Sequence, residues 1–214
     1  MKATAVLPVK RFSGAKQRLA AGIEDVRREA LVAAMLEDTL EAIALARSIE
    51  RTIVVSGDPR AQEIVAASAA EVLPDPADEG HVVAALAGIA RAEADGAECV
   101  VLLPGDCPLL DPKELDSLLT GMPARFVAVV PDRHGAGTNA LALAPPGAIR
   151  PAFGEGSCAR HVAAAREAGV PYAVEELSSL GLDLDTPADV VALTRVLDEG
   201  VSGRAKRTAK ALGI

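Results

Sequence analysis

Short runs of aliphatic and β-branched residues alternate with longer amphipathic stretches from one end of the chain to the other. Apolar runs of this length are typical of strands that are buried on both faces of a sheet. The expected strands cover residues 3–9, 51–56, 71–74, 98–103, 126–130, 139–143 and 171–175. The amphipathic stretches predict helices over about 24–47, 60–68, 81–95, 111–119, 157–168 and 187–198.

This alternation predicts an α/β fold with three layers, α/β/α, around a mostly parallel sheet. The strands at 126–130 and 139–143 are joined by a short polar loop, which favours an antiparallel pair and therefore a mixed sheet. Because no repeat or linker interrupts the pattern, we expect a single domain over residues 1–200. Residues 201–214 are expected to form a short basic C-terminal tail that is frayed.

Composition narrows the class of protein. Half of the 214 residues are hydrophobic but only 2% are aromatic, so the core must be built from Ala, Val and Leu. The net charge of −8 argues against a nucleic-acid-binding protein, because neutralising many phosphates needs a basic face. A nucleotide ligand remains compatible with this charge, since a local basic cluster is enough to bind it.

The cysteines and the apolar stretches indicate the cellular compartment in which the protein is expected. Cys99, Cys107 and Cys158 have no metal-binding or redox spacing, which indicates structural thiols in a reducing environment. All apolar stretches are shorter than a membrane span, and the first residues predict a strand rather than a signal peptide. We therefore expect a cytoplasmic protein without membrane contact, and the oligomeric state stays open, with a homodimer among the alternatives.

One carboxylate lies where a buried strand meets its loop. The apolar run at 100–103 ends in Pro-Gly-Asp, which places Asp106 at the carboxyl end of a strand. Ligands of open α/β sheets bind at this edge, and a carboxylate there suits a divalent metal and phosphate chemistry. The structural alternative is that Asp106 caps the following helix. Asp111-Pro112 matches a helix start better, which favours the ligand role of Asp106.

A second pair of carboxylates, Asp183 and Asp185, precedes the last long helix. Mg²⁺ typically takes one or two carboxylates together with substrate phosphates, so one of this pair could complete a magnesium site with Asp106. Side chains alternate along an extended segment, so only one of the two easily faces the site. Because Asp185 stands directly before Thr186-Pro187, near a helix N-cap, we favour Asp183 as the ligand and Asp185 as a structural or supporting residue.

A cationic loop follows the first strand. It carries Lys10, Arg11, Lys16 and Arg18 but neither of the glycine patterns that bind phosphates through the backbone. Its side chains can instead offer charge to an anion, as Lys and Arg do for a transferring phosphoryl group. The alternative interpretation is a solvated charge run.

Two glycine-containing segments are candidates for anion binding. They are Gly135–Asn139 and Gly154–Ser157, and the second opens a helix whose N–H groups and Ser157 hydroxyl could hold a carboxylate or phosphate. The alternative for each is ordinary turn and capping chemistry.

The histidines and serines do not predict nucleophilic or zinc chemistry. His81, His134 and His161 share no metal-ligand spacing, and no nucleophile elbow is present. Ser157 and His161 lie four residues apart on one helix face, and we interpret this pairing as incidental.

Five segments of the chain form an ordered set. They are Pro8–Arg11 with Ala15–Leu19, then Gly105–Leu109, Gly137–Leu141, Phe153–Ser157 and Asp183–Asp189. Together they resemble the CofC/FbiD family, the 2-phospholactate or phosphoenolpyruvate guanylyltransferases of coenzyme F-420 biosynthesis. The resemblance spans residues 3–195 and implies a nucleotide-diphospho-sugar-transferase-like, Rossmann-related domain with a mixed central sheet.

The resemblance also implies site residues. Asp106 and Asp183 match the magnesium-binding aspartates, and with Lys16 they are the residues expected to be catalytic. Thr138, Gly154 and Ser157 match the positions that hold the phospho-acid. Lys10, Lys16 and Arg18 match a loop along the triphosphate, and Asp75 and Gly80 match the segment near the guanosine.

The implied reaction joins the GMP part of GTP to a phosphorylated three-carbon acid and releases pyrophosphate, with Mg²⁺ as cofactor. The acid would be 2-phospho-L-lactate, phosphoenolpyruvate or 3-phosphoglycerate. One alternative is another nucleotidyltransferase of this fold, of cytidylyl or molybdopterin type, although Leu7–Lys10 replaces the Leu-Ala-Gly-Gly with which such enzymes usually open. The other is a non-catalytic nucleotide-binding protein, which would not need the carboxylates.

Overall fold

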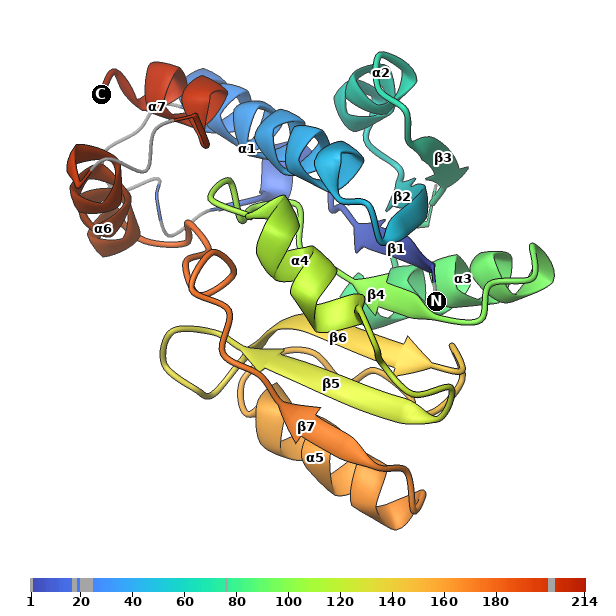
Figure 1. Cartoon of the computed structure of the whole chain (residues 1–214). Coiled ribbons are helices and arrows are strands. Elements are labelled where there is room, and N and C mark those ends of the chain that lie inside the picture. The colour runs from blue at the N-terminus through green and yellow to red at the C-terminus, as the bar shows by residue number, and fades with distance from the viewer. Residues whose placement is uncertain (1, 17–18, 20–24, 76, 200–202) are drawn as a thin grey trace.

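The computed structural model describes residues 2–16, 19, 25–75, 77–199 and 203–214, which form a seven-stranded mixed sheet with helices on both faces (Figure 1). The strands are β1 (Ala3–Pro8), β2 (Ile49–Ser56), β3 (Glu71–Pro74), β4 (Val100–Leu102), β5 (Phe126–Pro131), β6 (Thr138–Ala144) and β7 (Tyr172–Val174). The helices are α1 (Asp25–Leu45), α2 (Pro59–Ala66), α3 (His81–Ala94), α4 (Pro112–Leu119), α5 (Ser157–Glu167), α6 (Pro187–Asp198), α7 (Lys206–Leu212) and the 3-10 turn η1 (Phe12–Gly14). The predicted α/β fold with a mixed central sheet is confirmed.

Alternate residues of the central strands face two different cores, as the pleat of a strand requires. In β1, Leu7 packs into the core that also contains residues of α1, α2, α4 and α6, whereas Val6 packs against α3. In β5, Ala128 faces the first core and Val127 faces the second, which includes residues of α5. The continuous apolar runs of the sequence therefore reflect burial on both faces. None of the helices in the described part combines the length and apolar character needed to span a lipid bilayer.

The order of strands is β3-β2-β1-β4-β6-β5-β7, and only β6 runs antiparallel to its neighbours. The loop before β6 closes around Asp132, whose carboxylate accepts backbone N–H groups of His134, Ala136 and Gly137 at 2.9–3.0 Å. A Cβ on Gly137 would lie 2.5 Å from Asp132 Oδ2, so this close approach requires glycine. Because β6 is antiparallel, it begins at the edge where β4 ends, and Thr138 thus lies at the ligand-binding edge of the sheet.

The expectation of a frayed basic tail is wrong. Residues near the C-terminus form α7, which packs along α1 (Figure 1). Asp38 of α1 is only 6% exposed and accepts the backbone N–H of Arg207 at 3.2 Å and that of Thr208 at 2.9 Å, as well as the Thr208 hydroxyl at 2.8 Å. The Arg207 guanidinium also pairs with Glu37 and Glu41. The basic residues are thus matched by an acidic face of α1 that lies far away in the sequence.

Replacing Asp38 with Ala is expected to lower the free energy of unfolding by about 2–3 kcal/mol, because the buried donors of α7 would lose their acceptor. Glu37→Ala is the matched control, since this carboxylate is 41% exposed and its pair with Arg207 should contribute less than about 1 kcal/mol. Urea denaturation of both variants measures the difference. Equal losses would contradict the role given to Asp38.

Candidate active site

The loop after β1 is anchored between Lys10 and Lys16. Phe12 is buried, and its backbone N–H donates to Asp58 Oδ2 at 2.8 Å. Asp58 is itself the buried N-cap of α2, where Oδ1 accepts two backbone N–H groups of that helix. This contact ties the loop to the carboxyl end of β2 and leaves Lys10 and Lys16 on either side of the anchor.

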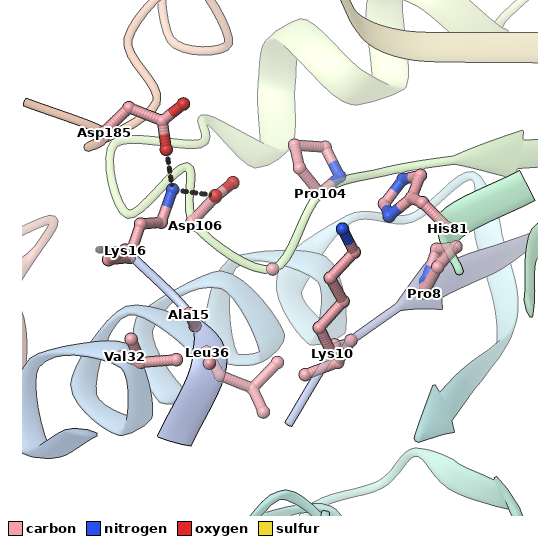
Figure 2. A pocket seen from close by; sticks show the side chains of 13 residues that line it. Pro8, Lys10, Ala15, Lys16, Val32, Leu36, His81, Pro104, Asp106 and Asp185 are labelled. Carbon is pink, nitrogen blue, oxygen red and sulfur yellow. Dashed lines mark hydrogen bonds and ion pairs between the residues drawn. The ribbon is translucent and has the colours of Figure 1, made fainter. Parts of the chain in front are cut away.

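Lys16 joins two acidic segments that are distant in the sequence. Its ammonium donates to Asp106 Oδ2 and to Asp185 Oδ1 (Figure 2). Burial alone would lower the pKa of Lys16, but the charges and hydrogen bonds of the two carboxylates outweigh it and raise the pKa above its ordinary value. The side chain is 9% exposed, so Lys16 provides a fixed positive charge at neutral pH.

The structure removes the capping alternative for Asp106. Asp111 is the N-cap of α4, where its carboxylate accepts the backbone N–H of Lys113 at 2.8 Å, and Pro112 occupies the first turn as expected. Asp106 instead lines the cavity at the strand ends. Its Oδ2 meets Lys16, whereas its Oδ1 is buried and has no hydrogen-bond partner among the described residues.

Asp183 lies in the same cluster of charges. Its Oδ1 is 3.4 Å from the side-chain nitrogen of Asn139 at the start of β6, and that nitrogen also donates to the Leu180 carbonyl at 2.7 Å. Burial raises the pKa of Asp183, and the negative charges of Asp106 and Asp185 raise it further. The backbone N–H of Leu184 donates to the Asp106 carbonyl at 3.4 Å, so the segment with Asp183 and Asp185 lies against Asp106 at this edge of the sheet.

Asp185 is not the helix cap that its position suggested. Thr186 caps α6 through a reciprocal capping box with Asp189, so the Asp185 carboxylate is free to meet Lys16. Asp183 and Asp185 also lie on the same side of their segment, and not on opposite sides as expected, because positions two residues apart in an extended segment share a face. Both are half-buried, whereas Leu182 and Leu184 are buried. Asp185 therefore lies in the site together with Asp183.

These carboxylates fit a divalent cation that is shared with a substrate. No group of three His, Cys, Asp or Glu side chains in the described ranges is close enough to hold a metal by itself. Mg²⁺ rarely needs such a group, because one or two carboxylates and substrate phosphates complete its shell. The unpartnered buried Oδ1 of Asp106 offers an oxygen ligand whose negative charge the protein does not fully compensate.

A cavity of about 300 Å³ lies beside the cluster. Val32 and Leu36 of α1 form an apolar part of its wall. Its charged lining residues are Lys10, Lys16, Asp106 and Asp185. Figure 2 shows the acidic residues at one end and His81, at the start of α3, at the other. Burial lowers the pKa of His81 and outweighs the opposite effect of the Asp106 charge, so the imidazole is neutral at pH 7.

A second, more open cavity of about 440 Å³ continues from the first, with which it shares Lys10 and Gly14. Gly80 lines it as the N-cap of α3, with a φ of 110° that favours glycine. Asp75 supports this wall rather than lining it, because its Oδ1 accepts the backbone N–H of Asp78 at 3.2 Å. The residues expected near a guanosine therefore belong to one loop beside the charged cavity.

The residues expected to hold the phospho-acid meet at the start of β6 and of α5. Thr138 is half-buried, and the fully buried Ser157 donates its hydroxyl to Thr138 Oγ1 at 3.1 Å. The backbone N–H of Ser157 already donates to the Gly154 carbonyl at 3.0 Å, and that of Cys158 donates to the Ala136 carbonyl at 3.2 Å. The first N–H groups of α5 are thus satisfied by the protein, and Thr138 is the more exposed polar group of the set.

Arg18, expected along the triphosphate, lies outside the described residues. His81 and Asn139 were not expected in the site, and Asp185 was expected to be a structural or supporting residue. Asn139 and His81 stand directly beside Thr138 and Gly80 in the sequence, which is the signal that could have pointed to them. Asp185 was not favoured as a ligand because it precedes a helix N-cap and because the side chains of the pair were taken to alternate.

Comparison with known proteins identifies the family. The family model "Guanylyl transferase CofC like" matches residues 3–214. The chain is 45% identical over 208 residues to a phosphoenolpyruvate guanylyltransferase of Conexibacter woesei, covering 96% of this chain and 93% of the relative. It is 40% identical over 214 residues to a 3-phospho-D-glycerate guanylyltransferase of Phenylobacterium zucineum, covering 98% and 95%.

Among solved structures, the fold is similar to a chain assigned as a nucleotide-diphospho-sugar transferase from Desulfovibrio desulfuricans. The TM-score is 0.76 at 17% identity, with 98% of this chain and 94% of that chain covered. This confirms the expected nucleotide-diphospho-sugar-transferase-like fold. The extent of the family match and the identity to curated relatives show that the chain belongs to the CofC-like guanylyl transferases.

Proposed function

We propose that the chain transfers the GMP part of GTP to the phosphate of a phosphorylated three-carbon acid, with release of pyrophosphate, as a step of coenzyme F-420 biosynthesis. The observation that carries this proposal is the Lys16 ammonium between Asp106 and Asp185, beside a cavity that Lys10 also lines. Fixed cations next to carboxylates suit a reaction between two phosphate anions. The names of the relatives, which include guanylyltransferases of phosphoenolpyruvate and of 3-phospho-D-glycerate, support this class of acceptor.

The chemistry needs positioning and charge more than acid–base catalysis. The attacking group is a phosphate monoester that is already ionised at neutral pH, so no side chain has to remove a proton from it. Repulsion between this phosphate and the triphosphate is the obstacle, and positive side chains that hold both in line reduce it. Lys10 and Lys16 supply such charge in the described part of the site, and Arg18 is proposed to add to it.

We infer that Mg²⁺ is the cofactor and that Asp106 and Asp183 hold it, with Asp185 beside them. The buried, unpartnered Oδ1 of Asp106 supports this assignment, as does the coupling of Asp183 to two neighbouring negative charges. When bound, Mg²⁺ supplies positive charge to the reacting phosphates. The role of Lys16 is then to place a second positive charge at the same edge of the sheet.

The substrates are proposed to divide between the two sides of the site. The loop with Asp75 and Gly80 borders the second cavity, where we place the guanosine. Thr138, with Gly154 and Ser157 behind it, is proposed to hold the phospho-acid. A cytidylyltransferase of the same fold remains the rival activity, because the fold alone does not choose the base.

An assay of pyrophosphate release with a panel of substrates tests the proposal. GTP and CTP are each combined with Mg²⁺ and with 2-phospho-L-lactate, phosphoenolpyruvate or 3-phosphoglycerate, and lactate serves as the acceptor without a phosphate. We expect release from GTP with at least one phospho-acid and none with lactate. Release from CTP with another acceptor, and none from GTP with any phospho-acid, would overturn the proposal.

A further inference from the structure

A buried histidine behind Thr138, His161, has no role in the activity as described so far. His161 of α5 is fully buried, and its Nδ1 lies 3.0 Å from Thr138 Oγ1. Its other ring nitrogen, Nε2, accepts the backbone N–H of Ala152 at 2.8 Å. Ser157, one turn earlier on the same helix, contacts the same Thr138 oxygen. The Ser157–His161 pair is therefore organised around a residue of β6.

The protons of this group can be assigned from its partners. The backbone N–H of Ala152 can only donate, so Nε2 of His161 must accept with its lone pair. The single proton of a neutral imidazole is therefore on Nδ1. Burial lowers the pKa of His161 to about 4, with a smaller contribution from the charge of Arg160, so the ring is neutral at pH 7. The Nδ1–H group therefore donates to Thr138 Oγ1.

Ser157 donates to the same oxygen. Its hydroxyl is fully buried, so its proton needs an acceptor inside the protein, and Thr138 Oγ1 provides it at 3.1 Å. Two donors then occupy the two lone pairs of Thr138 Oγ1. The Thr138 hydroxyl can then form a further hydrogen bond only by donating its own proton. Thr138 is half-buried, unlike Ser157 and His161, so this proton can reach a ligand.

We propose that His161 is a positioning residue which, with Ser157, makes the Thr138 hydroxyl an obligatory hydrogen-bond donor to an anionic oxygen of the acceptor substrate. This inference rests on the proposed function, because it assumes that the phospho-acid lies against Thr138. A carboxylate or phosphate oxygen only accepts and therefore suits such a hydroxyl, whereas an ammonium group, which only donates, would leave the hydroxyl unsatisfied. The arrangement therefore selects an acceptor oxygen, which the anionic groups of the phospho-acid provide.

The same group is connected to the charged cavity. Phe153 lies between the two histidines, with ring centroids 5.4 Å from His161 and 4.9 Å from His81, and both contacts are edge-on. His81 lines the cavity of Lys16 and Asp106. The start of β6 also carries Asn139, which contacts Asp183. Thr138 is thus the chain neighbour of a residue that contacts Asp183.

Two substitutions of His161 separate its two contacts. Asn carries an amide nitrogen near the position of Nδ1, so it keeps the hydrogen bond to Thr138. Gln carries an amide oxygen near the position of Nε2, so it keeps the hydrogen bond from the Ala152 N–H and loses the one to Thr138. We expect His161→Gln to raise the KM for the phospho-acid by about 10-fold, the equivalent of one lost hydrogen bond, and His161→Asn to raise it by less than about 3-fold. The KM for GTP should change by less than about twofold in both variants.

A double-mutant cycle with Thr138→Val distinguishes positioning from a general effect on folding. If His161 acts through Thr138, His161→Gln should have less than about a twofold effect on kcat/KM for the phospho-acid once the Thr138 hydroxyl is absent. An effect of the same size in both backgrounds, or an equal rise in the KM for GTP, would overturn the proposal.

Nitrogen NMR of the histidine rings in the unsubstituted protein provides a measurement that needs no activity and no variant. We expect His161 to show a proton on Nδ1 from pH 6 to pH 8, and a proton on Nε2 instead would overturn the inference. If the unsubstituted protein releases no pyrophosphate with any phospho-acid, the proposed function fails, and the NMR result still decides the proton arrangement.

Discussion

Replacing Asp106 with Asn is expected to lower kcat/KM for pyrophosphate release by about 10³-fold or more, equivalent to roughly 4 kcal/mol of transition-state stabilisation. The amide keeps the size of the side chain but removes the negative charge that Lys16 meets and replaces one of the two carboxylate oxygens with a nitrogen, so the side chain becomes a much weaker metal ligand. The fold should persist, because α4 is capped by Asp111 and not by Asp106. Steady-state kinetics with GTP and the preferred phospho-acid give the loss, and the thermal midpoint shows that the protein is folded.

Two variants make this result specific. Asp183→Asn should also lose most of the activity, because its carboxylate belongs to the same cluster. Asp95→Asn is the control, since Asp95 pairs with Arg51 and Arg91 away from the site and its loss should change kcat/KM by less than about twofold. Near-normal turnover of both Asp106→Asn and Asp183→Asn would remove these residues from the proposed metal site.

Replacing Lys16 with Met is expected to lower kcat/KM by about 10²- to 10³-fold, because a fixed cation that stabilises the transferring phosphoryl group is lost. A second effect follows from the charge of Lys16, which opposes the raised pKa of Asp183. Without Lys16 the Asp183 carboxylate should hold its proton to higher pH, so the acidic limb of the activity profile should move to higher pH.

Rate measurements from pH 5 to pH 8 on Lys16→Met and on the unsubstituted protein detect both effects. Lys113→Met is the matched control, since Lys113 is exposed on α4. We expect that control to match the unsubstituted protein in rate and profile. A Lys16→Met variant with an unchanged acidic limb would show that Lys16 does not influence the protonation of Asp183.

Much of the fold follows from local patterns in the sequence. Apolar runs indicate the strands because central strands bury both faces, as Val6 and Leu7 show by facing different cores. The short polar loop around Asp132 indicates the antiparallel β6, and Asp111-Pro112 indicates the start of α4. These features depend on neighbours in the chain, so a single sequence is enough to predict them.

The features that the sequence did not reveal depend on distant partners. α7 is held by Asp38, which lies 170 residues before Thr208, and basic residues near the C-terminus give no local sign of that acceptor. Asp185 enters the site because its carboxylate meets Lys16, which lies 169 residues before it in the chain. A serine and a histidine on one helix face are common. Ser157 and His161 differ from such pairs because both contact Thr138 on β6, which the sequence does not show.

The transfer of labelled phosphorus from GTP tests the central claim most directly. GTP labelled at the α-phosphate is incubated with the protein, Mg²⁺ and each phospho-acid. The products are separated and identified by mass spectrometry. We predict that the label appears in a compound that joins GMP to the acid, formed in equal amount to pyrophosphate and only when a phospho-acid is present. Label recovered solely in GMP or GDP, or transfer from CTP but not from GTP, would contradict the account.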